Sequence, residues 1–186
     1  MIIDSHCHLN MENFNGDLTE VIGNAKRNNI CGMLTISTKI DEFKNISNIA
    51  KNNQNIWYSL GIHPHNVDEN FNNVGSIIVN YNQDKKFIGI GETGLDYFYK
   101  NTNKELQKQS FIKHIQLSRE TKLPIIVHTR EADEDTISIL KNEYNKEPFN
   151  GLIHCFTATQ ELANEVLELG FYISISGIIT FKNAET

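Results

Sequence analysis

The chain has 186 residues, of which 39% are hydrophobic and 22% are charged, and its formal net charge is −6. This composition is that of an ordinary globular protein and excludes a disordered or low-complexity chain. No stretch approaches the roughly 18 apolar residues that a membrane helix needs. The acidic balance argues against a protein that coats nucleic acid through a general basic field, but it leaves open an enzyme that acts on a phosphodiester in a local pocket.

The cysteines and the first residues indicate the compartment. Cys7, Cys31 and Cys155 are far apart and form no Cys-x-x-Cys motif, so neither a disulfide framework nor a zinc ribbon is predicted. We interpret all three as small buried hydrophobic residues. The N-terminal segment carries Asp4 and no long apolar run, so no signal peptide is expected. A reducing, cytoplasmic compartment fits these features best.

Short runs rich in Ile, Val, Phe and Tyr alternate with helix-like stretches along the chain. Such near-continuous apolar runs are typical of strands buried on both faces. The predicted strands are residues 2–4, 32–37, 56–61, 87–91, 124–128, 151–155 and 171–176. Apolar residues at helical spacing predict helices through 18–25, 74–81, 111–115, 137–144 and 162–169. Asp17 and Glu20 are interpreted as a capping pair at the start of the first helix.

The alternation of strands and helices predicts βαβ units and a parallel sheet within a single domain over residues 1–186. The unit length suits a TIM-type (β/α)8 barrel, which typically needs about 250 residues. Only seven strands can be assigned. The sequence therefore predicts either an open sheet or a barrel whose last strand–helix unit is absent from this chain.

Histidines mark the candidate chemistry. Six of the seven lie at or just past the C-terminal end of a predicted strand, the edge where parallel α/β folds build their active sites. These six are His6, His8, His63, His65, His128 and His154. The seventh, His114, falls within a predicted helix, and we interpret it as an ordinary helix residue.

Five of the side chains on this rim predict a metal centre. His6 and His8 are two apart on an extended segment, so their rings point to one side and can reach one ion at about 2.0–2.1 Å. Alone, this pair also suits two hydrogen-bonded polar residues at a strand end. His128 and His154 end two further strands, and Glu92 follows the fourth strand with two oxygens that can bridge two ions. Their shared rim favours a metal centre.

The neighbours of these residues carry weaker signals. Cys7 and Cys155 have the opposite strand parity to the histidines beside them, so we expect both thiols to point toward the surrounding helices. Gly89, Gly91 and Gly94 lack the strand–GxGxxG–helix order of a dinucleotide site. They instead predict a close approach of backbone to the rim site.

Several segments, in order along the chain, resemble the motif series of the TatD-family metal-dependent hydrolases, which are TIM-barrel deoxyribonucleases related to the amidohydrolases. These segments are DSHCHL at 4–9, GIHPH at 61–65, GETGLD at 91–96, PIIVHTR at 124–130 and HCF at 154–156. Residues 175–182 are also similar to the family's segment after the seventh strand. The resemblance covers essentially the whole chain.

The resemblance implies a site with two divalent ions. His6 and His8 would hold the first ion, His128 and His154 would hold the second, and Glu92 would bridge both and take part in catalysis. The family adds an aspartate after the eighth strand on the first metal, and the sequence has no such segment. Nitrogen and oxygen ligands accept Zn, Mn, Co or Mg, so the identity of the metal stays open.

The implied reaction is hydrolysis of DNA phosphodiester bonds by a metal-bound hydroxide, of the 3′–5′ exonuclease type. Arg130 follows His128 by two residues and therefore shares its side of the strand, where a planar guanidinium suits phosphate. An ion pair of Arg130 with Glu131 or Glu134 is the alternative. No base-reading motif is present, so DNA would be bound without sequence specificity.

Two residues of the GIHPH segment carry open roles. His63 could donate to a phosphate or transfer a proton, and His65 could hold the loop. A core or loop-bracing role is the alternative for each.

Two other functions compete with the nuclease. An amidohydrolase acting on a C–N bond shares the His-x-His motif and the barrel, but those enzymes commonly carry a bridging lysine where this sequence has Glu92. The third interpretation is a non-catalytic metal-binding fragment. No obligate protein partner and no membrane association are predicted.

Overall fold

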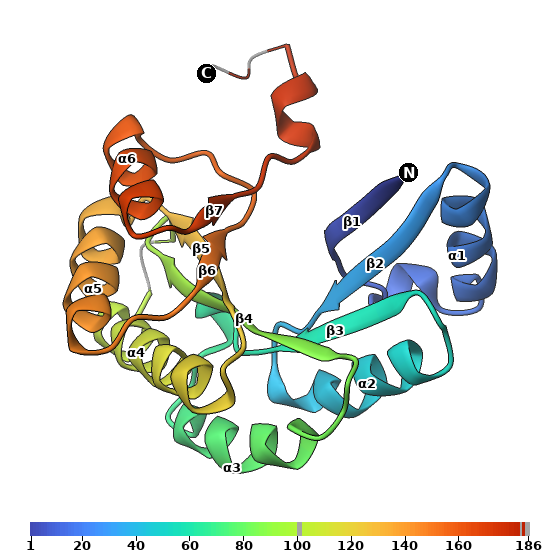
Figure 1. Cartoon of the computed structure of the whole chain (residues 1–186), viewed down its shortest axis with the longest axis horizontal. Helices are drawn as coiled ribbons and strands as arrows, with labels where there is room; N and C mark the ends of the chain where they lie inside the picture. The colour runs from blue at the N-terminus through green and yellow to red at the C-terminus, as the bar shows by residue number, and fades with distance from the viewer. Residues whose placement is uncertain (100–101, 183, 185–186) are drawn as a thin grey trace.

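The computed structural model describes residues 1–99, 102–182 and 184. Seven parallel strands form one sheet in the order β1-β2-β3-β4-β5-β6-β7, so each strand pairs with its neighbours in sequence. In Figure 1 the sheet curves into an open arc with β1 and β7 at its two ends, and the helices cover its outer side. The predicted parallel α/β architecture is confirmed. No eighth strand lies among these described residues, and the predicted absence of a barrel unit stays a prediction.

The elements alternate as the sequence predicts. The strands are β1 (Ile2–Cys7), β2 (Ile30–Ile36), β3 (Ile56–Leu60), β4 (Phe87–Asp96), β5 (Ile125–Arg130), β6 (Gly151–Ile153) and β7 (Tyr172–Ile173). The helices are α1 (Leu18–Arg27), α2 (Phe43–Lys51), α3 (Val74–Ile78), α4 (Lys104–Thr121), α5 (Asp133–Lys146) and α6 (Gln160–Glu168). None of the helices in the described ranges is long and apolar enough to span a membrane.

The structure differs from the local predictions at several places. The strand β4 does not end before Glu92 but continues to Asp96, and β7 is shorter than predicted. Helix α2 was missed although Phe43, Ile46 and Ile49 recur at helical spacing along its buried face. Asp17 precedes α1 without a capping hydrogen bond from its side chain, since its backbone (φ −115°, ψ 2°) is not in the extended conformation that an N-cap residue adopts.

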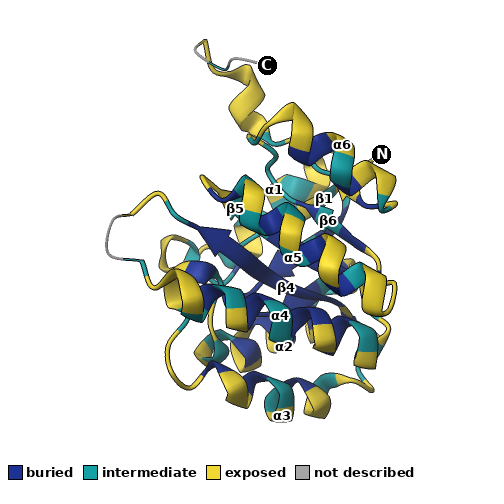
Figure 2. Ribbon diagram, turned by 90° about the vertical axis from the view of Figure 1, so that its left-hand side faces the viewer, coloured by how far each residue is buried: buried dark blue, intermediate teal, exposed yellow. Residues whose placement is uncertain are grey.

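The core fills the space between the curved sheet and its helices. One cluster of buried apolar residues joins β2 and β3 to α2 and α3, and a second joins β5 and β6 to α4, α5 and α6. Figure 2 shows β4 as a buried strand between helices whose outer faces are exposed. The sheet is thus held from outside, and the C-terminal ends of its strands meet at one edge.

The cysteines are not the buried hydrophobic residues that we predicted. All three are half-buried free thiols. Cys7 packs against the first core cluster as expected, and burial together with Asp4 raises its pKa to about 12, which makes it a poor nucleophile. Cys155 does not face a helix, because its Sγ lies 2.9 Å from Oγ of Ser176 in the segment after β7.

Candidate metal centre

Glu92 lies near the middle of β4 and is 3% exposed. The glycines around it allow this strand to approach β5 closely: Gly91 has φ 138° and Gly94 has φ 134°, and a Cβ on either would overlap a backbone carbonyl oxygen of β5. The close approach that these two glycines permit is to β5, and the predicted approach of backbone to the rim site stays a prediction. The carboxylate of Glu92 is placed among the histidines of four other strand ends.

The two oxygens of Glu92 face two different pairs of histidines. Oε2 lies 3.2 Å from Nε2 of His6 and 3.7 Å from Nε2 of His8. Oε1 lies 3.1 Å from Nδ1 of His128 and 2.8 Å from Nε2 of His154. The structure therefore brings together all five side chains that the sequence singled out, and it divides them between the two carboxylate oxygens.

In His8 and His128, the ring nitrogen farther from Glu92 makes a hydrogen bond. This bond decides which of the two ring nitrogens carries the hydrogen. Nδ1 of His8 lies 3.0 Å from the carbonyl oxygen of Ile36. Nε2 of His128 lies 2.9 Å from Oδ2 of Asp96. Since a carbonyl and a carboxylate oxygen only accept, both contacts require a hydrogen on that nitrogen and leave a lone pair on the inner nitrogen of the neutral ring. This arrangement is common for histidines that bind metals.

The inner atoms fit a cation. With its hydrogen on Nε2, His128 presents the Nδ1 lone pair to Oε1 of Glu92 at 3.1 Å and to Nε2 of His154 at 3.2 Å. The two ring nitrogens of His6 are buried and make no hydrogen bond. Converging acceptors and an orphaned imidazole need a proton or a metal ion between them, and this donor set of nitrogen and carboxylate oxygen suits divalent transition metals.

The electrostatics of the centre favour an ionised carboxylate. Burial raises the pKa of Glu92, but its contacts with the imidazoles of His128 and His154 outweigh burial and bring the pKa well below its ordinary value. Burial lowers the pKa of His128, and the neighbouring carboxylates of Glu92 and Asp96 reverse that effect, so its pKa lies above the ordinary value. A negative charge is therefore permanently present at the middle of the histidine cluster.

Asp96 is the residue that the sequence interpretation missed. It lies at the end of β4, is 1% exposed, and contacts both His128 and Nε2 of His65, the latter at 3.0 Å. The available signal was its position four residues after Glu92 in the same GETGLD segment, an even spacing that keeps both carboxylates on one side of a strand.

His63 has a different role from the other histidines. Its Nδ1 accepts a hydrogen bond from the backbone N–H of His65 at 3.1 Å, so the neutral ring carries its hydrogen on Nε2. That nitrogen lies 3.5 Å from Oε1 of Glu92. Burial lowers the pKa of His63 to about 3, with His128 and His65 acting in the same direction. His63 is therefore a neutral hydrogen-bond donor at the centre.

Helix α4 holds the loop that carries His63 and His65. Gln107, which is buried, accepts from the N–H of Asp96 at 2.9 Å and donates to the carbonyl oxygen of Pro64 at 3.2 Å. Two helical turns later, Nε2 of His114 accepts from the N–H of Ile62 at 3.1 Å. His114 lies within α4, as predicted, and is fully buried. The two side chains bind the end of β3 to the end of β4.

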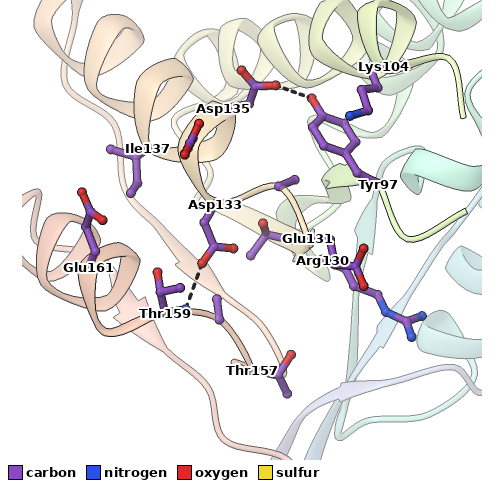
Figure 3. Close-up of a pocket in the computed structure, with 14 residues that line it drawn as sticks. Tyr97, Lys104, Arg130, Glu131, Asp133, Asp135, Ile137, Thr157, Thr159 and Glu161 are labelled. Carbon is purple, nitrogen blue, oxygen red and sulfur yellow. Dashed lines mark hydrogen bonds between the residues drawn. The ribbon is translucent and has the colours of Figure 1, made fainter. Parts of the chain in front are cut away.

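Arg130 lies at the rim, at the end of β5. Its guanidinium carbon is 3.6 Å from the centroid of the Phe98 ring, and no ion pair joins it to Glu131 or Glu134 within the described ranges. A pocket of about 880 Å³ opens beside it between α5 and the segment after β6. In Figure 3 the Arg130 guanidinium points away from Asp133, which accepts a hydrogen bond from the backbone of Thr159.

The sequence is similar to proteins of one family. A family described as TatD related DNase matches residues 3–186. A protein of Buchnera aphidicola subsp. Baizongia pistaciae, described as an uncharacterized metal-dependent hydrolase, is 42% identical over 187 residues, covering 99% of this chain and 70% of the relative. A protein of Klebsiella pneumoniae named 3′-5′ ssDNA/RNA exonuclease TatD is 28% identical over 176 residues, covering 95% of this chain and 66% of that protein.

Solved structures carry the same fold. The crystal structure of YjjV, a TatD homologue from Escherichia coli K12, superposes with a TM-score of 0.89 at 24% identity, covering 99% of this chain and 71% of that one. The extent of the family match and the identity to the Buchnera relative establish the relationship. This chain belongs to the TatD-related DNase family of metal-dependent hydrolases.

Proposed function

We propose that this protein is a two-metal phosphodiesterase that shortens single-stranded DNA from its 3′ end. The observation that carries the proposal is the division of Glu92, whose two oxygens face two separate pairs of histidines. One carboxylate placed in this way can bridge two ions, which is the arrangement of many enzymes that hydrolyse phosphodiesters.

The proposed ligands follow from the ring nitrogens that face Glu92. His6 and His8 would hold one ion through Nε2, and His128 through Nδ1 with His154 through Nε2 would hold the other. Bound there, the ions would polarise a phosphoryl oxygen and supply a water molecule of lowered pKa. Zn, Mn, Co and Mg all suit this donor set.

Other side chains of the centre would contact the substrate, orient a metal ligand and balance the charge of the ions. Neutral His63 carries its hydrogen on Nε2, 3.5 Å from Oε1 of Glu92, and when substrate is bound this N–H would turn to donate to a phosphoryl oxygen. Asp96 keeps the hydrogen of His128 on the outer nitrogen. The buried carboxylate of Glu92 stays ionised and offsets the charge of the ions.

The nucleic-acid substrate is supported by Arg130. Its guanidinium carbon lies 3.6 Å over the ring of Phe98, and the forked N–H groups of a guanidinium match a phosphate. The chain has a formal charge of −6, so a local contact between Arg130 and a phosphate would replace a general basic surface. A phosphate contact reads no bases, and the proposed binding is therefore independent of DNA sequence. The name of the Klebsiella relative supports the same substrate class.

The test is the shortening of a single-stranded oligonucleotide labelled at its 5′ end, with each divalent metal and with a chelator. Progressive shortening from the 3′ end that stops in the chelator is the expected result, and Glu92→Gln should abolish it. Turnover of a dihydropyrimidine or an N-acyl amino acid without any DNA cleavage would favour the amidohydrolase instead. Metal binding without turnover of any of these substrates would favour the non-catalytic protein.

A further inference from the structure

Two exposed aromatic residues, Phe98 and Tyr99, follow β4 directly beside the metal centre. Phe98 is 44% exposed and Tyr99 is 54% exposed. Their rings meet edge to face with centroids 5.0 Å apart. An adjacent pair of exposed aromatic side chains at the mouth of a polar site points to a ligand with a flat apolar face.

The pair connects to the centre through a short series of contacts. The ring of Tyr99 lies 5.0 Å from that of His65. His65 contacts Asp96 at 3.0 Å, and Asp96 contacts His128 at 2.9 Å. Tyr99 is therefore linked to the proposed metal ligand His128 through two intervening side chains, those of His65 and Asp96.

Arg130 adds a phosphate contact to the same surface. Parallel pairing of β4 with β5 sets Arg130 opposite Asp96, and its guanidinium then lies 3.6 Å above the ring of Phe98. One face of Phe98 holds the cation in place. Aromatic faces next to an oriented guanidinium are the two components with which proteins bind single strands irrespective of sequence.

We infer that Phe98 and Tyr99 form a stacking platform for the unpaired bases of a single strand, with Arg130 on the adjoining phosphate. The inference rests on the proposed function and deepens it, because it predicts a preference for unpaired ends. Bases in a duplex are stacked on one another and expose no face to the platform. In a chain with a net charge of −6, stacking also supplies affinity that does not depend on a basic surface.

The experiment compares three ligands of equal length: an ordinary single strand, a strand without bases, and a duplex. Binding is followed by fluorescence anisotropy in the presence of a chelator, so the result does not depend on cleavage. The ordinary strand should bind the wild-type protein about tenfold more tightly than the other two, the size expected for loss of a base–aromatic stack. Equal binding of the ordinary and the abasic strand would overturn the platform.

Single substitutions separate the stacking of bases on Tyr99 from the support that Phe98 gives to Arg130. Tyr99→Ala should weaken binding of the ordinary strand to the level of the abasic strand, and Tyr99→Trp should restore it. Phe98→Ala should weaken both strands, because it also releases Arg130. Tyr172→Ala is the matched control, since this aromatic residue is 77% exposed but lies on β7. A Tyr99→Ala effect equal on both strands would mean a structural role and would contradict the inference.

The same variants distinguish failure of the platform from failure of the proposed function. If the wild-type protein cleaves single strands but Tyr99→Ala changes neither binding nor KM, the platform is wrong and the nuclease stands. If the strand binds through its bases but no phosphodiester is cleaved with any divalent metal, the platform stands and the proposed reaction is wrong.

Discussion

Oδ2 of Asp96 lies 2.9 Å from Nε2 of His128, on the side of that ring opposite to Glu92. This contact keeps the hydrogen of the ring on the outer nitrogen and directs the lone pair of Nδ1 into the centre. Asp96 is not among the proposed metal ligands. Its buried carboxylate nevertheless decides which nitrogen of the proposed ligand His128 can bind an ion.

Asp96→Asn should lower the affinity for the ion at His128 and His154 by about 10- to 100-fold, the usual cost of losing such an outer contact. An amide can donate to Nε2 and stabilise the wrong tautomer. Isothermal titration with a divalent metal measures the change, and Asp135→Asn serves as a rim control. Unchanged affinity would show that Asp96 does not orient the ring.

Glu92→Gln should weaken both ions, because it removes the charge that faces both histidine pairs. Metal stoichiometry, measured after dialysis against a buffered divalent ion, should fall from two ions per chain. Loss of a single ion would show that Glu92 is a terminal ligand. Glu131→Gln, at the exposed rim, is the matched control and should keep both ions.

Arg130→Ala should raise the KM for an oligonucleotide by about tenfold, the scale of one charge-assisted hydrogen bond, and raise the KM for a small aryl phosphodiester less. Arg130→Lys should recover only part of the loss, since an ammonium group has neither the flat face that rests on Phe98 nor the forked edge. Equal effects on the two substrates would place Arg130 at the scissile phosphate instead of at a neighbouring one.

His114→Gln should change how stability depends on pH. Burial lowers the pKa of His114 from 6.5 to about 4, so the folded protein holds this ring neutral while the unfolded chain takes up a proton below pH 6.5. The contribution of the neutral His114 ring to the free energy of unfolding is fully present above pH 6.5 and is lost as the pH falls toward 4.

Urea unfolding at several pH values tests this expectation. Between neutral pH and the folded pKa, the wild-type free energy of unfolding should fall by about 3 kcal/mol more than that of His114→Gln. The difference between the two proteins should be constant above pH 7, which serves as the internal control. Parallel pH profiles throughout would mean that the ring is not held neutral.

The outer strands of the sheet should promote self-association. Ile2 and Ile3 on β1 are 58% and 68% exposed, and an outer strand presents unpaired backbone groups to other chains. Light scattering should show a mass that rises with concentration, and Ile3→Lys should reduce it. A single monomeric species at every concentration would refute this expectation.

Much of the fold and of the site could be predicted from local patterns. Apolar runs alternating with helical stripes indicate parallel strands, and parallel strands bring their C-terminal ends to one edge. His6, Glu92 and His154 could therefore be placed together without knowledge of any contact, because each lies at the end of such a run. Helix α2 carries the same local signal, because Phe43, Ile46 and Ile49 recur at helical spacing on its buried face, and it was overlooked among the polar residues of a nine-residue segment.

The sequence by itself determined which chemical groups gather at the rim: imidazoles and one carboxylate, delivered by the alternation of strands and helices. Only the tertiary structure decided what each group can do. The carbonyl of Ile36 and the carboxylate of Asp96 set the tautomers of His8 and His128, and they come from other strands of the sheet. A ring nitrogen takes its role from the hydrogen-bond partner of the other ring nitrogen, and the pairing of that partner with a particular histidine depends on how neighbouring strands pack.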